Sequence, residues 1–184
     1  MFELYDRITG RMDRLGDDLL PLLARFVFAA VLLVYYINSG LTKVGDGLFG
    51  FLNPSSGAYV QIFPKAMEAA GYDVSQLPAV YSLIVLAGTW AEFVLPVLIV
   101  IGLFTRLAAL GMIGFVVVQS LTDLFGHGGI AFPETLGAWF DPISDGLILD
   151  QRAFWVLALS VLVLKGGGWL SADRLMRARL VRLA

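Results

Sequence analysis

A run of 25 residues, Val80–Phe104, is apolar except for one carboxylate, Glu92, near its middle. At 1.5 Å per residue, a helix of this length crosses the hydrocarbon core of a bilayer, which is about 30 Å thick. A Glu side chain at that depth costs a few kcal/mol, so it must face protein or water and must be paired or protonated. The run therefore predicts a membrane-spanning helix with a polar contact or a functional group at its centre.

The composition excludes several classes of protein. The chain has 184 residues, of which 58% are hydrophobic and 15% charged, a balance typical of integral membrane proteins. The net charge of −2 and the lack of a basic arm argue against nucleic acid as a partner. There is no cysteine and only one histidine, His127, so we expect no metal site and no covalently bound cofactor.

Three other apolar stretches have the length of a membrane span. We expect four transmembrane helices, over residues 19–41, 80–104, 107–125 and 147–165. Long loops follow the first and third of them, over residues 43–78 and 126–151, and a basic tail covers residues 166–184. Consecutive spans run in opposite directions, so the expected fold class is an all-α integral membrane protein: one domain, an antiparallel bundle of four helices.

Short amphipathic segments flank the spans. Residues 1–18 have helical spacing of apolar side chains and indicate either a helix on the membrane surface or a solvated arm. Residues 58–70 predict a surface helix broken near Pro64, in a loop that caps the bundle. Ser171 can cap a final basic helix whose side chains suit anionic headgroups: Arg174, Arg177, Arg179 and Arg182.

The distribution of basic residues predicts the orientation. The N-terminal segment, the turn at Arg106 and the C-terminal tail hold nine Lys and Arg residues, whereas the long loops and their edges hold three. By the positive-inside rule, both termini are expected in the cytoplasm and both long loops outside.

With this orientation, several polar residues lie in the outer half of the bundle, above Glu92. We expect them to line one ligand-binding cavity, with Glu92 at its floor and Tyr36 and Trp90 as walls: Asn38, Lys43, Gln119, Asp123 and His127. Gln119 and Asp123 are four residues apart and so share a helix face. No catalytic residues are assigned.

Each charged candidate also has a structural interpretation. Glu92 can be a proton acceptor or ligand group, or an interhelical contact that keeps the bundle in register. Lys43 and Asp123 can form an interfacial ion pair. Arg25 and Lys43, on one helix face, can extend to opposite membrane interfaces.

Three motifs resemble the DoxX family of small four-helix membrane proteins. They are GLTK at Gly40–Lys43, AEFVLPVLIVIGLFTRLAAL at Ala91–Leu110 and GGGWLSADRL at Gly166–Leu175. The chain differs at Pro96, where the family usually has glycine and leucine, and its first long loop is longer than typical. The resemblance implies a bacterial inner-membrane protein, and the family is associated with quinone-linked sulfur oxidation and with complexes containing thiosulfate sulfurtransferase and superoxide dismutase.

Two functions remain open from the sequence. In the first, the chain is a membrane subunit or anchor of a redox system, with a soluble oxidoreductase or sulfurtransferase partner and a quinone site near Glu92. In the second, it is a non-redox permease, small-molecule binder or assembly factor. Four helices without an evident inverted repeat would need a homo-oligomer to transport on their own.

Overall fold

The computed structural model describes residues 2–183, and their side chains up to residue 179, so the side chain of Arg182 lies outside the described residues. The described chain is helical and contains no strands, which confirms the expected fold class. The α-helices are α1 (Phe2–Phe28), α2 (Val34–Leu41), α3 (Ser56–Ile62), α4 (Pro64–Ala69), α5 (Ala79–Ile101), α6 (Thr105–Leu121), α7 (Pro133–Leu136), α8 (Ala153–Lys165) and α9 (Ala172–Leu183). A π-helical turn at Ala29–Leu33 joins α1 to α2, and two others, at Thr122–Gly126 and Leu147–Arg152, extend α6 and precede α8.

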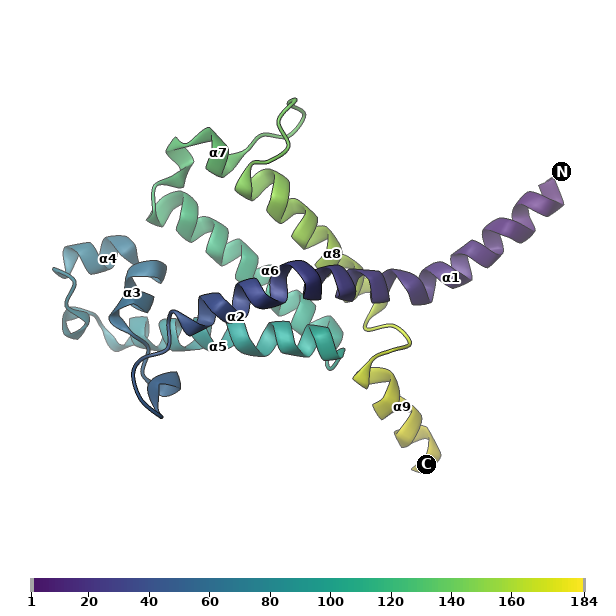
Figure 1. Cartoon of the computed structure of the whole chain (residues 1–184), viewed down its shortest axis with the longest axis horizontal. Helices are drawn as coiled ribbons and strands as arrows, with labels where there is room; N and C mark the ends of the chain where they lie inside the picture. Colours follow the sequence, from purple (N-terminus) through teal and green to yellow (C-terminus); the bar gives the residue numbers. More distant parts are fainter. Residues whose placement is uncertain (1, 184) are drawn as a thin grey trace.

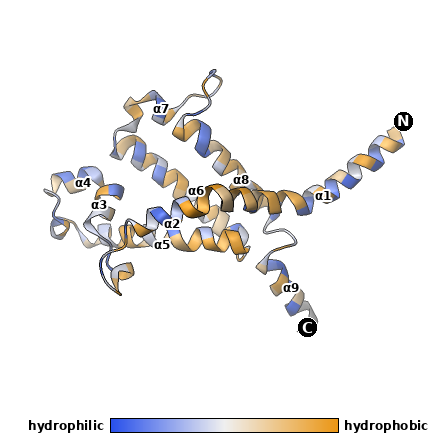
Figure 2. Ribbon diagram, viewed as in Figure 1, coloured by the Kyte–Doolittle hydropathy of each residue, from blue (hydrophilic) through white to orange (hydrophobic). Residues whose placement is uncertain are grey.

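Four helical segments are long and apolar enough to cross a membrane. They cover Phe2–Leu41, Ala79–Ile101, Thr105–Gly126 and Leu147–Lys165. They form a closed bundle, in which α2 contacts α5, α5 contacts α6, α6 contacts α8 and α8 contacts α1 (Figure 1). Hydrophobic residues dominate these segments, and polar ones gather on the N-terminal part of α1, on the loops and on α9 (Figure 2). The chain is therefore a multi-pass membrane protein.

The bundle has two distinct ends. Both termini and the short α5–α6 turn lie at one end, here called the terminal end, and the long loops lie at the other, the loop end (Figure 1). The core between the helices is apolar, with Phe28, Tyr36, Met112 and Leu159 among its fully buried side chains. Many large apolar side chains, such as Leu107, are instead exposed on the outside of the bundle, as expected where the surroundings are lipid.

The first helix is longer than expected. Residues 2–41 form one continuous helical segment, α1 to α2, rather than a separate surface helix followed by a span. Figure 1 shows the N-terminal part of α1 projecting from the bundle. The helix continues through Gly16, Asp17 and Asp18, residue types that are common in turns, and through Pro21.

The long loop packs on the bundle through two short helices. α3 ends at Ile62, because Pro64 starts α4 and disfavours a helical conformation in Phe63, the residue before it. Tyr59 and Met67 from these helices pack against Val85 near the start of α5. The loop thus covers the loop end, as the sequence indicated.

Buried polar groups join the segments of the terminal end. The Arg25 guanidinium, 8% exposed, donates hydrogen bonds to four backbone carbonyls: Ile99 and Val100 at the end of α5, and Gly167 and Leu170 after α8. Arg25 thus extends to the end of the bundle, where protein carbonyls rather than solvent accept its hydrogen bonds. The guanidinium has five N–H donors, so it can bond to several carbonyls that helix ends leave without partners. These hydrogen bonds hold the side chain inside the protein.

The start of α6 is capped from a distant part of the chain. Asp173 accepts hydrogen bonds from the backbone N–H of Phe104 (2.7 Å) and from both the N–H and the hydroxyl of Thr105 (2.9 and 2.7 Å). Its own N–H donates to the carbonyl of Gly102. The Ser171 hydroxyl accepts from the N–H of Arg174, so the predicted cap of the last helix is confirmed. The second and third sequence motifs therefore meet at one junction.

Candidate functional site

A cavity of about 570 Å³ lies between α2, α5 and α6 toward the loop end. We call it the membrane cavity. Its polar lining residues are Tyr35, Ser39, Lys43, Gln61, Glu92, Gln119, Thr122, Asp123 and His127, and its apolar and small ones include Ile84, Ala87, Gly88, Ala91, Leu95, Gly111, Gly114, Phe115 and Val118. The cavity is thus largely apolar with a smaller number of polar groups, as in most sites for small ligands.

Glu92 and Lys43 form a buried ion pair on its wall. The Lys43 Nζ lies 3.0 Å from each carboxylate oxygen of Glu92, and the two residues are only 5% and 3% exposed. Oε1 also accepts a hydrogen bond from the Ser39 hydroxyl, at 2.9 Å. Oε2 accepts no hydrogen bond of regular geometry from the described residues. One buried oxygen of the carboxylate is therefore left for a further donor.

The sequence places these groups together through close contact of two helices. A Cβ on Gly40 would lie 2.7 Å from the Phe93 ring, so only glycine allows α2 to approach α5 this closely. Ser39 and Lys43 are four residues apart and both reach Glu92. Lys43 also donates to the Ser39 hydroxyl and carbonyl, which fixes its ammonium group at the end of α2.

Hydrogen bonds between two tyrosines and a glutamine link α2 to α6. The Gln119 side chain accepts a hydrogen bond from the Tyr36 hydroxyl and donates one to the Tyr35 hydroxyl, at 3.3 and 2.8 Å. Since Tyr35 accepts this bond, its own hydroxyl proton is available to a ligand.

Contacts between distant segments lie at the loop end of the cavity. The ring Nε2 of His127 lies 2.9 Å from the carbonyl of Gln61 at the end of α3. Asp123, in the π-helical turn after α6, pairs with the buried Arg152 of the turn before α8. Arg152 also donates to the Ser120 hydroxyl. These contacts hold the α6 and α8 ends of the bundle together next to the cavity.

The structure brings most of the expected residues to one place. Lys43, Glu92, Gln119, Asp123 and His127 all line the membrane cavity, and Glu92 is paired inside the bundle rather than facing lipid. Their role in binding a ligand stays a prediction. Lys43 is buried and paired with Glu92 rather than extended into solvent.

Other expectations are corrected. Asn38 is exposed and does not line the cavity, because it lies about 100° around the helix from Ser39. Tyr36 and Trp90 are not walls: Tyr36 is buried in the core, and Trp90 donates to the carbonyl of Phe51 outside the cavity. The ion pair between Lys43 and Asp123 does not form, since each has another partner.

Five contributors were missed by the sequence reasoning: Tyr35, Ser39, Gln61 and Thr122 line the cavity, and Arg152 pairs with Asp123. A signal for two of them was present, because Tyr35 and Ser39 precede Lys43 at intervals of four residues and so share its helix face. Gln61 comes from the loop, and Arg152 pairs across two helices. No local pattern indicates either contact.

The cavity is not sealed from the membrane. Ile84, Gly111, Gly114 and Val118 line it and are also exposed on the surface of α5 and α6. These residues belong to membrane-spanning segments, so the opening faces acyl chains. Within residues 2–183, no group of three or more His, Asp or Glu side chains is placed to hold a metal ion. The site is suited to a lipid-soluble molecule with a polar head.

A family model described as DoxX matches residues 20–124, more than half of the chain. The match runs from within the first span to within the third and includes every residue that lines the membrane cavity except His127. No curated protein and no solved structure matches the chain.

Proposed function

The chain belongs to the DoxX family, and we propose that it is the membrane subunit of a redox system that binds a quinol in the membrane cavity. One observation carries this proposal: Glu92, a buried carboxylate paired with Lys43, lines a cavity that opens toward lipid, and its Oε2 accepts no hydrogen bond of regular geometry from the described residues. A quinol is lipid-soluble and presents hydroxyl donors, which suit this oxygen.

The lining residues fit such a molecule in size and polarity. Gly88, Ala91 and Gly114 leave room for a flat ring, and a Cβ on Gly114 would meet no atom within 4 Å. Glu92 would accept from one hydroxyl and Tyr35 could donate to the ring oxygens. When bound, a quinol supplies two electrons and two protons. Glu92 and its Lys43 partner could take up or return a proton there.

The electrons must pass to another protein. The sequence has no cysteine and a single histidine, so its side chains offer neither a dithiol nor paired histidine ligands for a haem. The proposal therefore includes a soluble oxidoreductase or sulfurtransferase partner. We place the chain in a bacterial inner membrane with both termini in the cytoplasm, on the basis of the family and of the nine basic residues in the terminal segments.

The test is the quinone content of the full chain after gentle purification from its native membrane, measured by solvent extraction and chromatography. We expect quinone in the wild type, with loss of about tenfold in Glu92→Gln, because a neutral amide is a weaker acceptor than a carboxylate. Gly114→Leu fills the cavity and should also lose the quinone. The control is Ala30→Leu, which introduces the same side chain at an exposed position of the first span. This variant should retain the quinone.

A second function is favoured by the polar loop end of the cavity. Gln61, Asp123 and His127 line it there, next to the loops, where a water-soluble molecule could enter. In this alternative the protein binds or translocates a polar solute and needs no redox partner. Absence of quinone in the wild type, together with a solute whose binding is lost in Glu92→Gln, would establish the alternative and reject the quinol site.

A further inference from the structure

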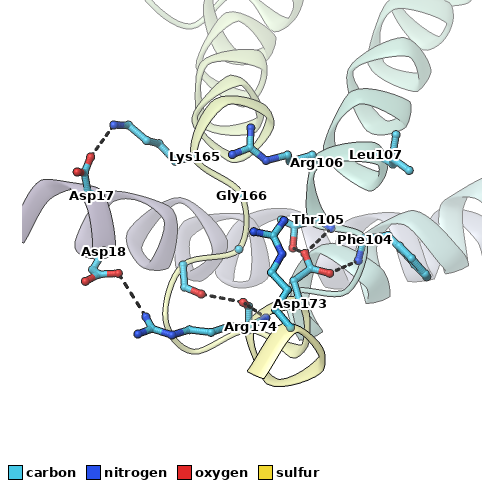
Figure 3. Close-up of a pocket in the computed structure, with 14 residues that line it drawn as sticks. Asp17, Asp18, Phe104, Thr105, Arg106, Leu107, Lys165, Gly166, Asp173 and Arg174 are labelled. Carbon is cyan, nitrogen blue, oxygen red and sulfur yellow. Dashed lines mark hydrogen bonds and ion pairs between the residues drawn. The ribbon is translucent and has the colours of Figure 1, made fainter. Parts of the chain in front are cut away.

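A second cavity, of about 480 Å³, lies at the terminal end between α1, the start of α6, the end of α8 and the start of α9 (Figure 3). We call it the terminal cavity. Four cationic side chains from three helices line it: Arg106, Lys165, Arg174 and Arg177. Basic residues far apart in the sequence are therefore gathered around one hollow.

The acidic residues of the terminal cavity form only weak ion pairs with these four cationic side chains. Asp173 is engaged in capping α6. Asp17 pairs with Lys165 at 2.6 Å and Asp18 with Arg174 at 3.7 Å, and all four of these side chains are 46% exposed or more. Exposed ion pairs contribute at most about 1 kcal/mol, so a stronger anion can replace these carboxylates.

The other two cations are not held in ion pairs within the described chain, although Arg177 lies near Asp173, which caps α6. Arg106 and Arg177 form no ion pair among the described residues, although Arg106 donates one hydrogen bond to the Val163 carbonyl. Guanidinium groups match the oxygens of a phosphate through paired hydrogen bonds. The terminal cavity thus has unused donors that suit a phosphate group.

The position of the cavity indicates what carries the phosphate. It lies where the spans end, at the Phe104–Thr105 turn and at Lys165, the last residue of α8. Phe104 and Leu107 line it and are 57% and 69% exposed, so apolar surface adjoins the cationic groups at the boundary of the membrane. This combination matches a phospholipid, with its phosphate among the cations and its chains against Phe104 and Leu107.

We infer that the terminal cavity binds the headgroup phosphate of an anionic phospholipid through Arg106, Lys165, Arg174 and Arg177. The site is separate from the membrane cavity and does not depend on the proposed quinol. A lipid held there would connect α6, α8 and α9 at the junction that Arg25 and Asp173 also stabilise.

The test is native mass spectrometry of the full chain, released from detergent with equal amounts of phosphatidylglycerol and phosphatidylcholine. The wild type should retain phosphatidylglycerol preferentially. Arg106→Gln/Arg177→Gln should reduce this preference by about fivefold for each cation removed. The control, Arg7→Gln/Arg11→Gln, removes the same charge from exposed positions on α1 and should leave the preference unchanged within about twofold.

Three results would overturn the inference: equal retention of both lipids by the wild type, equal losses in the two double variants, and displacement of the lipid by inorganic phosphate alone. The last would assign the site to free phosphate. If the first double variant does not fold, Arg177→Gln on the exposed surface of α9 gives the same test, with about a fivefold loss expected.

Discussion

The ammonium group of Lys43 and the carboxylate of Glu92 lie 3.0 Å apart between α2 and α5, and neither residue is more than 5% exposed. Removal of either partner would leave the other charge buried without an opposite charge, which is strongly destabilising. The pair therefore joins the two helices and also sets the charge of the membrane cavity.

This pair predicts a characteristic result in a double-mutant cycle. Glu92→Leu leaves Lys43 buried without a partner and should lower the free energy of unfolding by about 3–5 kcal/mol. Lys43→Met/Glu92→Leu removes both charges and should recover most of the loss. Denaturant unfolding in mild detergent measures all the variants. A double variant less stable than either single one would contradict this account of the pair.

Arg25 should be needed for the junction at the terminal end. Arg25→Met removes its hydrogen bonds to four carbonyls and should cost about 3 kcal/mol or more. Arg25→Lys should recover only part of this free energy of unfolding, because an ammonium group lacks the planar set of five donors of a guanidinium. Arg14→Met is the control, since exposed Arg14 bonds only to Gly10 in its own helix. Thermal unfolding compares them, and equal shifts for Arg25→Met and Arg14→Met would contradict the prediction.

Two glycines should respond oppositely to alanine. Gly102 ends α5 with φ of +70°, and a Cβ there would lie 2.7 Å from the Cβ of Ser171. Gly102→Ala should therefore destabilise by about 1–3 kcal/mol. A Cβ on Gly114 would have no atom within 4 Å, and alanine is the better helix former. Gly114→Ala should therefore be neutral or stabilising by up to about 1 kcal/mol. A Gly102→Ala protein with the wild-type melting temperature would show that the junction is loose.

The cap supplied by Asp173 should make stability depend on pH. Partial burial raises the pKa of Asp173, but hydrogen bonds from Thr105 and Phe104 and the nearby Arg177 outweigh this, so the pKa lies below its usual range. A lowered folded-state pKa means that the contribution is complete above the ordinary pKa of about 4 and is lost as the pH falls through the folded value.

Melting temperatures measured from pH 7 to pH 3 can isolate this contribution. The wild type should lose more stability than Asp173→Asn below about pH 4, and Asp173→Asn should already be less stable at pH 7. Asp13→Asn, at an exposed position on α1, is the control. Parallel pH curves for the wild type and Asp173→Asn would refute the role of the carboxylate.

The proposed orientation is checked by reporter fusions. Alkaline phosphatase joined after Ser56 or Glu134, in the two long loops, should be active because it is exported. The same reporter joined after Thr105, in the α5–α6 turn, should be inactive. Activity at Thr105 and none in the loops would reverse the topology and the assignment of the terminal end to the cytoplasm.

The sequence alone determined the features that depend on local pattern. The span lengths follow from the apolar runs, and three of the four observed spans begin and end within three residues of the expected ranges. The break before Pro64 and the cap at Ser171 follow from backbone chemistry within a few residues. That Glu92 is paired inside the bundle follows from the cost of a carboxylate in lipid.

Only the tertiary structure decided which side chains meet. Lys43 pairs with Glu92 rather than Asp123, and Asp123 with Arg152, because helix rotation and the close contact at Gly40 set these distances. The π-helical turns add to this, since each shifts the following residues around the helix axis by about one position. Arg25 remains inside because carbonyls from two distant turns converge on it, and a hydropathy pattern carries no information on such contacts between segments far apart in the chain.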